Sequence, residues 1–305
     1  MASLRFRRSD GSQADAEDVL QTLRREGSSI SEICVEEIAI RDEDVKEMEQ
    51  LLIQYHKAIH LSSLELPSNG LTMAAGKPLA SIVTAQYETL LKLDLSNNPL
   101  TSVGLGELIE PLTAKSLSPS RIQYLNLTAC QLGPRSAPML ASLIRNNRSI
   151  QTLLLSNNAL GTKTIKAMEP VLSTNSTLQT LDISYNAIKP RGAKLLAQAL
   201  LSSQNNNRSS LQKLDVTCNK LAPQGIQALC EMLVVNRTIQ TLLLGSNNME
   251  GEGAAYLANV LHFNYTLKEL DLESNQIGPD GASLLIDQLR DKNRTLETLN
   301  LAWNG

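Results

Sequence analysis

The chain has 305 residues, of which 42% are hydrophobic, 19% charged and 3% aromatic, and its formal net charge at pH 7 is −3. This charge gives no general attraction for nucleic acid or for an anionic membrane. No run of about 18 apolar residues could span a membrane, and the four cysteines lie far apart without a C-x-x-C pair, which argues against a zinc site or a disulfide framework. We therefore expect reduced thiols and a cytoplasmic protein.

The first residues contain an amphipathic helix pattern. In residues 15–26 the side chains of Val19, Leu20 and Leu23 fall on one helical face. An array of repeats leaves an apolar edge at its first unit, which a terminal segment commonly covers. We therefore predict that residues 1–29 form an N-terminal capping helix region.

From residue 30 to residue 305 the pattern L-x-x-L-x-L-x-x-N-x-L recurs ten times, with Ile, Val or Met replacing some leucines. The copies begin 28 to 33 residues apart, at Ile30, Leu61, Leu90, Ile122, Ile150, Leu178, Leu211, Ile239, Leu267 and Leu296. This period resembles that of leucine-rich repeats, in which each unit is a short strand followed by a helix. We predict one repeat domain over residues 30–305, with ten units of which the last is incomplete.

Within each unit the apolar spacing changes from two residues to three and four. Leu181 and Ile183 lie on one face of a strand, with Asp182 on the other. A helical spacing follows, at Ala193, Leu196, Ala197 and Leu200. Because strand-helix-strand crossovers are right-handed, the pattern predicts an α/β fold: a right-handed solenoid, or horseshoe arc, with a parallel inner sheet and outer helices.

The Asn of each motif is predicted to bind turning backbone, since a buried polar side chain without partners costs about 1–3 kcal/mol. Its amide offers two donors and an acceptor to its own and adjacent units. Cys130 is expected to act as a weakly hydrogen-bonding substitute, and Ile38 marks a degenerate first unit. The predicted ladder comprises Asn69, Asn98, Cys130, Asn158, Asn186, Asn219, Asn247, Asn275 and Asn304.

Seven N-x-S/T sequons raise the alternative of a glycosylated, secreted protein. Six of them fall between a helix and the next strand, at Asn147, Asn175, Asn207, Asn236, Asn264 and Asn293. We interpret these asparagines instead as residues in the left-handed conformation that ends helices.

Two polar insertions, residues 115–121 and 202–210, lengthen the connections from a helix to the following strand. Such rim loops either carry binding function or are tolerated insertions. At the other end, Leu296, Leu299 and Leu301 begin a unit that no helix follows. We expect either a longer natural chain or association through this uncapped C-terminal edge.

Catalytic motifs are missing from the sequence: there is no glycine-rich phosphate loop, H-E-x-x-H or G-x-S-x-G. The spacing of His56, His60 and His262 does not indicate a metal cluster. We predict no enzyme activity, no cofactor, no catalytic residue and no metal ligand.

The outward-facing strand positions should line a concave sheet, the usual binding face of solenoids. Five of the ten residues between the strand leucines are acidic, and Glu32, Glu36, Glu269 and Glu273 flank them, against Lys92 and Lys213. This face would complement a basic protein partner, with aromatic anchors near the strand ends; the alternative is that it is a solvated strand face. The predicted partner-binding residues are Asp94, Tyr124, Asp182, Tyr185, Asp215, Asp271 and Trp303.

The period, the L-D-L-S-x-N strands and helix starts such as residues 278–282 resemble the ribonuclease-inhibitor-like class of leucine-rich repeats. The resemblance implies the fold and says little of function. The class includes ribonuclease inhibitor, the Ran GTPase-activating protein, sensor domains of NOD-like receptors, and ciliary and cytoskeletal scaffolds. We expect a non-catalytic intracellular scaffold that binds a protein on its concave face, in a cytoskeletal or ciliary/flagellar assembly, without nucleic acid or membrane. The alternatives are a GTPase-activating protein resembling the Ran activator and the sensor domain of a NOD-like receptor.

Overall fold

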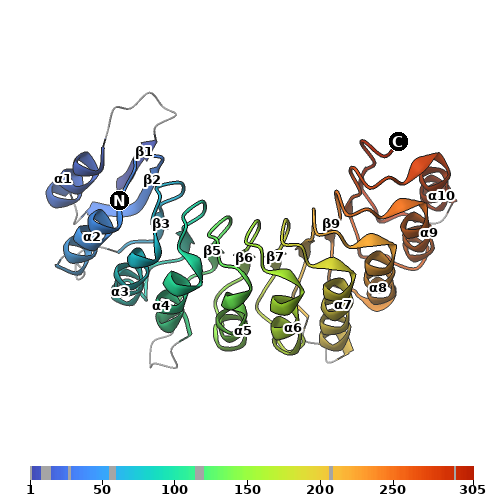
Figure 1. The fold of residues 1–305 in the computed structure, drawn as a ribbon, viewed down its shortest axis with the longest axis horizontal. Coiled ribbons are helices and arrows are strands. Elements are labelled where there is room, and N and C mark those ends of the chain that lie inside the picture. The colour runs from blue at the N-terminus through green and yellow to red at the C-terminus, as the bar shows by residue number, and fades with distance from the viewer. Residues whose placement is uncertain are drawn as a thin grey trace. The chain divides into compact units, whose positions relative to one another are not determined.

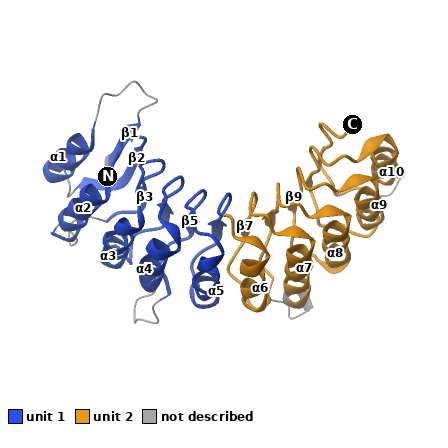
Figure 2. Cartoon of the chain, viewed as in Figure 1, with its two compact units in different colours: residues 1–158 blue, residues 159–305 orange. Residues whose placement is uncertain are grey.

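The computed structural model of the chain describes residues 2–7, 15–26, 29–54, 60–113, 120–205, 209–291 and 293–305. The chain divides into an N-terminal unit, Met1–Asn158, and a C-terminal unit, Ala159–Gly305 (Figure 2). In each unit, helices lie along one side of a row of short strands (Figure 1).

The N-terminal unit has a parallel sheet whose strands follow each other in chain order. The strands are β1 (Ala2–Arg7), β2 (Ile30–Glu36), β3 (Ser63–Glu65), β4 (Lys92–Asp94), β5 (Tyr124–Asn126) and β6 (Thr152–Leu154). The helices are α1 (Ala16–Glu26), α2 (Asp42–Gln54), α3 (Gly76–Ala85), α4 (Thr101–Thr113) and α5 (Ala137–Asn146), with the 3-10 turns η3 (Met73–Ala75) and η4 (Pro134–Ser136).

The C-terminal unit repeats the same alternation, and its strands are again parallel. The strands are β7 (Thr180–Asp182), β8 (Lys213–Asp215), β9 (Thr241–Leu243), β10 (Glu269–Asp271) and β11 (Thr298–Asn300). The helices are α6 (Gly161–Leu172), α7 (Lys189–Asn205), α8 (Ala222–Val235), α9 (Glu250–Leu261) and α10 (Gly278–Asp291). None of the helices described has the length and apolar character needed to cross a membrane.

An aliphatic core between strands and helices explains this arrangement. The middle leucine of each strand is aligned with that of its neighbour, as in Leu214 opposite Leu242, and both are fully buried. The helical positions Ala193 and Leu196 face the same core. The predicted α/β leucine-rich-repeat fold with parallel strands is thus confirmed.

The first strand was not predicted from the sequence. Helix α1 agrees with the pattern at residues 15–26, since Val19, Leu20 and Leu23 are its buried side chains. Ahead of it, β1 pairs in parallel with β2, with Leu4 opposite Ile33. The cover of the first repeat therefore includes a strand as well as a helix.

The motif asparagines form a buried hydrogen-bond ladder. The Oδ1 atom of Asn219 accepts from the backbone N–H groups of Asn186 (3.0 Å) and Ile188 (3.2 Å) in the preceding repeat. Its Nδ2 atom donates to the carbonyls of Ile183, Val216 and Thr217 at 2.8 to 3.1 Å. Bonds of the same kind recur at Asn69, Asn98, Asn158, Asn186, Asn247, Asn275 and Asn304.

Cys130 takes the ladder position between Asn98 and Asn158. Its Sγ atom donates to the carbonyl of Leu95 at 3.2 Å, where an asparagine would donate its amide. Burial raises the pKa of this thiol to about 12, so it is a neutral donor at pH 7.

The sequon asparagines form a second buried set between helix ends and strands. Asn264 donates from Nδ2 to the carbonyl of Leu233 (2.8 Å) and accepts through Oδ1 from the N–H of Leu267 (2.8 Å). The expectation of a left-handed conformation is wrong: Asn147 has φ −75° and ψ 139°, and Asn236 has φ −67° and ψ 134°. The side chain binds the following N–H groups, and this requires an extended backbone. Because their amides are buried, five of the sequons cannot accept a glycan in the folded chain, namely those at Asn147, Asn175, Asn236, Asn264 and Asn293; Asn207 lies outside the described residues.

Candidate protein-binding surface

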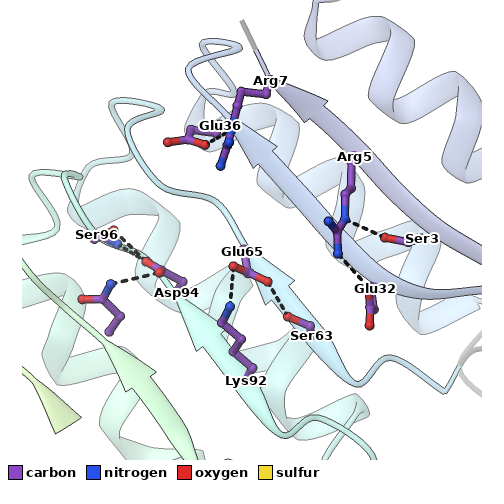
Figure 3. Close-up of polar contacts among 11 residues, drawn as sticks. Ser3, Arg5, Arg7, Glu32, Glu36, Ser63, Glu65, Lys92, Asp94 and Ser96 are labelled. Carbon is purple, nitrogen blue, oxygen red and sulfur yellow. Dashed lines mark hydrogen bonds and ion pairs between the residues drawn. The ribbon is translucent and has the colours of Figure 1, made fainter. Parts of the chain in front are cut away.

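The side of each sheet away from the helices, here called the open face, carries the strand residues that alternate with the buried leucines (Figure 1). In the N-terminal unit its charges are paired. Arg5 lies 3.4 Å from Glu32, Arg7 contacts Glu36, and Lys92 Nζ lies 2.7 Å from Glu65 Oε2 (Figure 3). Three of the four carboxylates on this face, those of Glu32, Glu36 and Glu65, therefore have a paired cation, and the fourth is that of Asp94.

Two of the predicted partner-binding residues, Asp94 and Tyr124, lie in this paired region. Asp94 Oδ1 accepts from the N–H (2.9 Å) and hydroxyl (2.7 Å) of Ser96, and Oδ2 accepts from Asn126 Nδ2 (2.9 Å). The ammonium of Lys92 lies 5.2 Å from the ring centre of Tyr124, a cation–π contact, and burial raises the pKa of Tyr124. Both side chains are thus engaged within the sheet.

Sequence reasoning missed Arg5 and Arg7, the residues that neutralise this end of the sheet. They lie on β1, which has no leucine motif. The alternation of Leu4 and Phe6 with Arg5 and Arg7 is nevertheless a period of two, and this signal could have predicted the strand.

The open face of the C-terminal unit is acidic and largely unpaired. We name five of its residues the acidic strip: Asp182, Asp215, Glu269, Asp271 and Glu273. Asp182 and Asp215 are opposite each other on β7 and β8. The only basic side chain on these strands is that of Lys213, and among the described residues none of the five acids forms an ion pair.

The aspartates of the acidic strip are held by the turn that follows each strand. Oδ1 of Asp182, Asp215 and Asp271 accepts from the backbone N–H two residues later, in each case at 2.9 Å. For Asp215, burial, and secondarily the charge of Asp182, raises the pKa. A cation brought to this point would relieve that unfavourable charge.

Two exposed aromatic residues flank the acidic strip. Tyr185 and Trp303 occupy the same repeat position, immediately before a ladder asparagine, with φ of 54° and 58°. Their exposed fractions are 57% and 82%. Cys218 raises the pKa of the Tyr185 hydroxyl through a side-chain hydrogen bond, and the charges of Asp215 and Glu273 act on it in the same direction.

The remaining expectations concern the C-terminal edge, the two rim loops and a metal site. Leu299 is only half-buried, whereas Leu270 at the same position in the preceding strand is fully buried; association through this edge stays a prediction. His56, residues 114–119 and residues 206–208 lie outside the described residues, so neither rim loop is described in full. Over the part of the chain that the structure describes, no three His, Cys, Asp or Glu side chains are grouped to hold a metal ion.

The repeat geometry, with its parallel strands and asparagine ladder, is that of leucine-rich-repeat proteins, and comparisons with known proteins agree. The family model described as "Leucine Rich repeat" matches residues 88–108, 174–197, 208–230, 235–258, 263–285 and 292–305. These matched repeats make the chain similar to the ribonuclease-inhibitor-like class of leucine-rich-repeat proteins.

Three known proteins illustrate the similarity. The chain is 32% identical to mouse ribonuclease inhibitor over 141 residues, covering 46% of this chain and 29% of that protein. It is 35% identical over 103 residues to mouse NACHT, LRR and PYD domains-containing protein 12, covering 34% of this chain and 9% of that protein. The structure of the leucine-rich repeat-containing protein LegL7 from Legionella pneumophila aligns with a TM-score of 0.53 at 18% identity, covering 92% of this chain and 88% of that one. The chain therefore spans less than a third of the length of these two mouse relatives.

Proposed function

We propose that this chain is a non-catalytic protein-interaction module whose acidic strip binds a basic segment of a partner protein. The observation that carries the proposal is the contrast between the two open faces. In the N-terminal unit, Arg5, Arg7 and Lys92 pair with the carboxylates, whereas in the C-terminal unit five carboxylates face one lysine.

Two features support a protein partner. Charged surfaces of this kind accelerate encounter with an oppositely charged partner and set its orientation. Tyr185 adds a large exposed ring beside the carboxylates, and tyrosine is over-represented among interface side chains that dominate affinity. Both features belong to the same unit.

The proposal is tested with a labelled peptide of alternating Arg and Ser and the full chain. D182N combined with D215N should weaken binding roughly tenfold at low salt, because each removed charge lay on the contact surface. The difference should shrink as the ionic strength approaches about 1 M, where the Debye length is about 3 Å. Tyr185→Ala should instead weaken binding at low and high salt alike.

Asp94→Asn is the matched control. Asp94 accepts the same backbone hydrogen bond from the residue two positions later, so its substitution makes the same local change on the neutralised face. It should leave peptide binding unchanged. The proposal would be contradicted if Asp94→Asn and D182N/D215N lost the same affinity for the peptide. It would also be contradicted if both variants bound the peptide as the parent does.

The finer assignments stay predictions. We propose a cytoskeletal or ciliary assembly as the setting only by analogy with scaffolds of the same class. A GTP turnover assay with small GTPases tests the alternative of a GTPase-activating protein.

A further inference from the structure

A second charged surface of the C-terminal unit lies on its helices, away from the strands. Five basic side chains gather where α6 and α7 begin, and we name them the basic cluster: Lys163, Lys166, Lys189, Arg191 and Lys194. All five are exposed. Among the described residues none of them forms an ion pair, although eight pairs engage other cations of the chain.

Helix α6 packs against α7, so the two helix starts that carry the five cations are neighbours (Figure 1). The hydroxyl of Thr162 donates to the carbonyl of Ile188 at 2.5 Å, which joins the two helix starts. A Cβ atom at Gly192 would lie only 3.7 Å from the Cα of Thr162. The two helices carry basic residues at equivalent positions of the repeat: Lys163 corresponds to Arg191, and Lys166 to Lys194.

The cations lie at the end of each helix where positive charge is least favourable. Aligned peptide dipoles make a helix N-terminus positive, so acidic residues stabilise it and basic residues do not. Some other helices of this chain follow the rule: α2 begins with Asp42, Glu43 and Asp44, and α9 with Glu250 and Glu252. Helices α6 and α7 have no acidic residue in the first turn. Glu169 of α6 is the one acidic residue in the two helices together.

We propose that the basic cluster binds an acidic segment of a partner polypeptide. An anion there would be attracted by the five cations and by the two helix N-termini at once. Neighbouring helices lie about 8–10 Å apart, and an extended chain rises about 3.3 Å per residue. Carboxylates three residues apart in an extended segment would therefore span the distance between Lys163 and Arg191.

Charge and composition favour a polypeptide over other polyanions. A nucleic acid carries a charge about every 1.7 Å along the duplex and needs a long basic track, whereas the two helices that follow α7 have Gln224 and Glu252 at the position of Arg191. A membrane surface would favour an exposed apolar residue among the cations, but Ile165 and Ala193, which lie between them in the sequence, are buried. A short acidic segment fits a cluster of this extent.

The test uses the full chain and a labelled peptide of alternating Glu and Ser, followed by fluorescence anisotropy at low and high salt. K163E combined with R191E should weaken binding at least about tenfold, while the midpoint of thermal unfolding should be no lower than that of the parent, because both changes place acids at helix N-termini. Folding failure would thus be visible separately from loss of binding. K163Q combined with R191Q should give an intermediate loss.

Lys77→Glu is the control: Lys77 is a single exposed cation in the first turn of α3, and its substitution changes the net charge as much as each of the two changes in K163E/R191E does. It should bind like the parent. Unchanged binding by K163E/R191E would overturn the proposal, as would equal losses for Lys77→Glu. A preference for phosphatidylserine vesicles or for single-stranded DNA over the peptide would also overturn it. D182N/D215N should still bind the acidic peptide. The proposal for the basic cluster can therefore fail while the proposal for the acidic strip holds, and the reverse.

Discussion

The ladder asparagine binds more backbone groups than any other side chain of the repeat. Asn219 accepts two N–H groups from the preceding repeat and donates to three carbonyls, all without contact with water. Asn219→Ala should lower the free energy of unfolding by about 2–4 kcal/mol, because each buried backbone group left unpaired costs about 1–3 kcal/mol. Urea titration followed by circular dichroism measures this change.

Cys130→Asn provides the control for that substitution. The new amide would find the carbonyl of Leu95, which now accepts from the thiol, and a backbone already shaped for the motif. The change in the free energy of unfolding should stay within about 1 kcal/mol. A large decrease in the free energy of unfolding for Cys130→Asn, together with no decrease for Asn219→Ala, would show that the ladder does not stabilise the turns.

Asp215 gives a prediction about pH. Burial raises its pKa above the ordinary value of 3.8, so the folded chain binds this proton more tightly than the unfolded chain. Its contribution to the free energy of unfolding therefore falls as pH rises from 3.8 through the folded pKa, and is constant above it. Asp215→Asn removes the charge and keeps the acceptor, as Asn126 and Asn300 show at the same position.

The Asp215→Asn chain should consequently be more stable than the parent at pH 7, and its advantage should disappear as pH falls through the pKa of Asp215. Denaturant titrations at several pH values measure the difference. An advantage that is equal at every pH would mean that the carboxyl charge is not its cause.

At the scale of the elements, one glycine allows two helices to pack closely, whereas another only lowers the stability of its own helix. A Cβ atom at Gly76 would lie 2.6 Å from the carbonyl oxygen of Gly104, so α3 and α4 meet backbone to backbone. At Gly106 the nearest atom is the flexible end of Met139, at 3.6 Å. Gly76→Ala should destabilise by about 1–3 kcal/mol, whereas Gly106→Ala, inside α4, should stabilise by up to about 1 kcal/mol.

Thermal and urea unfolding of both variants checks this pair. Destabilisation by Gly106→Ala of the same size as by Gly76→Ala would mean that helix contact is not what requires glycine at position 76.

The sequence predicted the elements wherever their apolar spacing is regular. The strand around Leu181 and the helix around Leu196 follow directly from periods of two and of three to four. It did not predict β1, because that strand belongs to the cap and lacks the motif. The charge pairing of the first open face depends on Arg5 and Arg7 of that strand, so the sequence overstated the acidity there.

The prediction for the backbone of the sequon asparagines was wrong for a different reason. Position at a helix end is compatible with a left-handed residue or with a side chain that binds the next turn, and composition does not separate the two. Hydrogen bonds such as that from Leu267 N–H to Asn264 select the second. Left-handed residues occur instead around the ladder, as at Tyr185 and Ala187.

For the whole molecule, a net charge of −3 hides two surfaces of opposite sign within the C-terminal unit. The acidic strip lies on strands and the turn after β10, and the basic cluster lies at helix starts, so separate elements carry them. A small net charge is therefore no guide to the charge of a partner, and one partner could present segments of both signs.

If the two surfaces are separate, substitutions on one should hardly change the free energy of peptide binding at the other. D182N/D215N should tighten binding of the acidic Glu-Ser peptide by less than about threefold at 0.1 M salt, since fields are screened within about 10 Å there. K163E/R191E should tighten binding of the basic Arg-Ser peptide by a similarly small factor. Both effects should vanish near 1 M salt, and the combined variant should show the sum of the single free-energy changes within about 0.5 kcal/mol. Anisotropy titrations with both peptides measure all of these values. A loss of acidic-peptide binding in D182N/D215N would mean instead that the two charged surfaces form a single site.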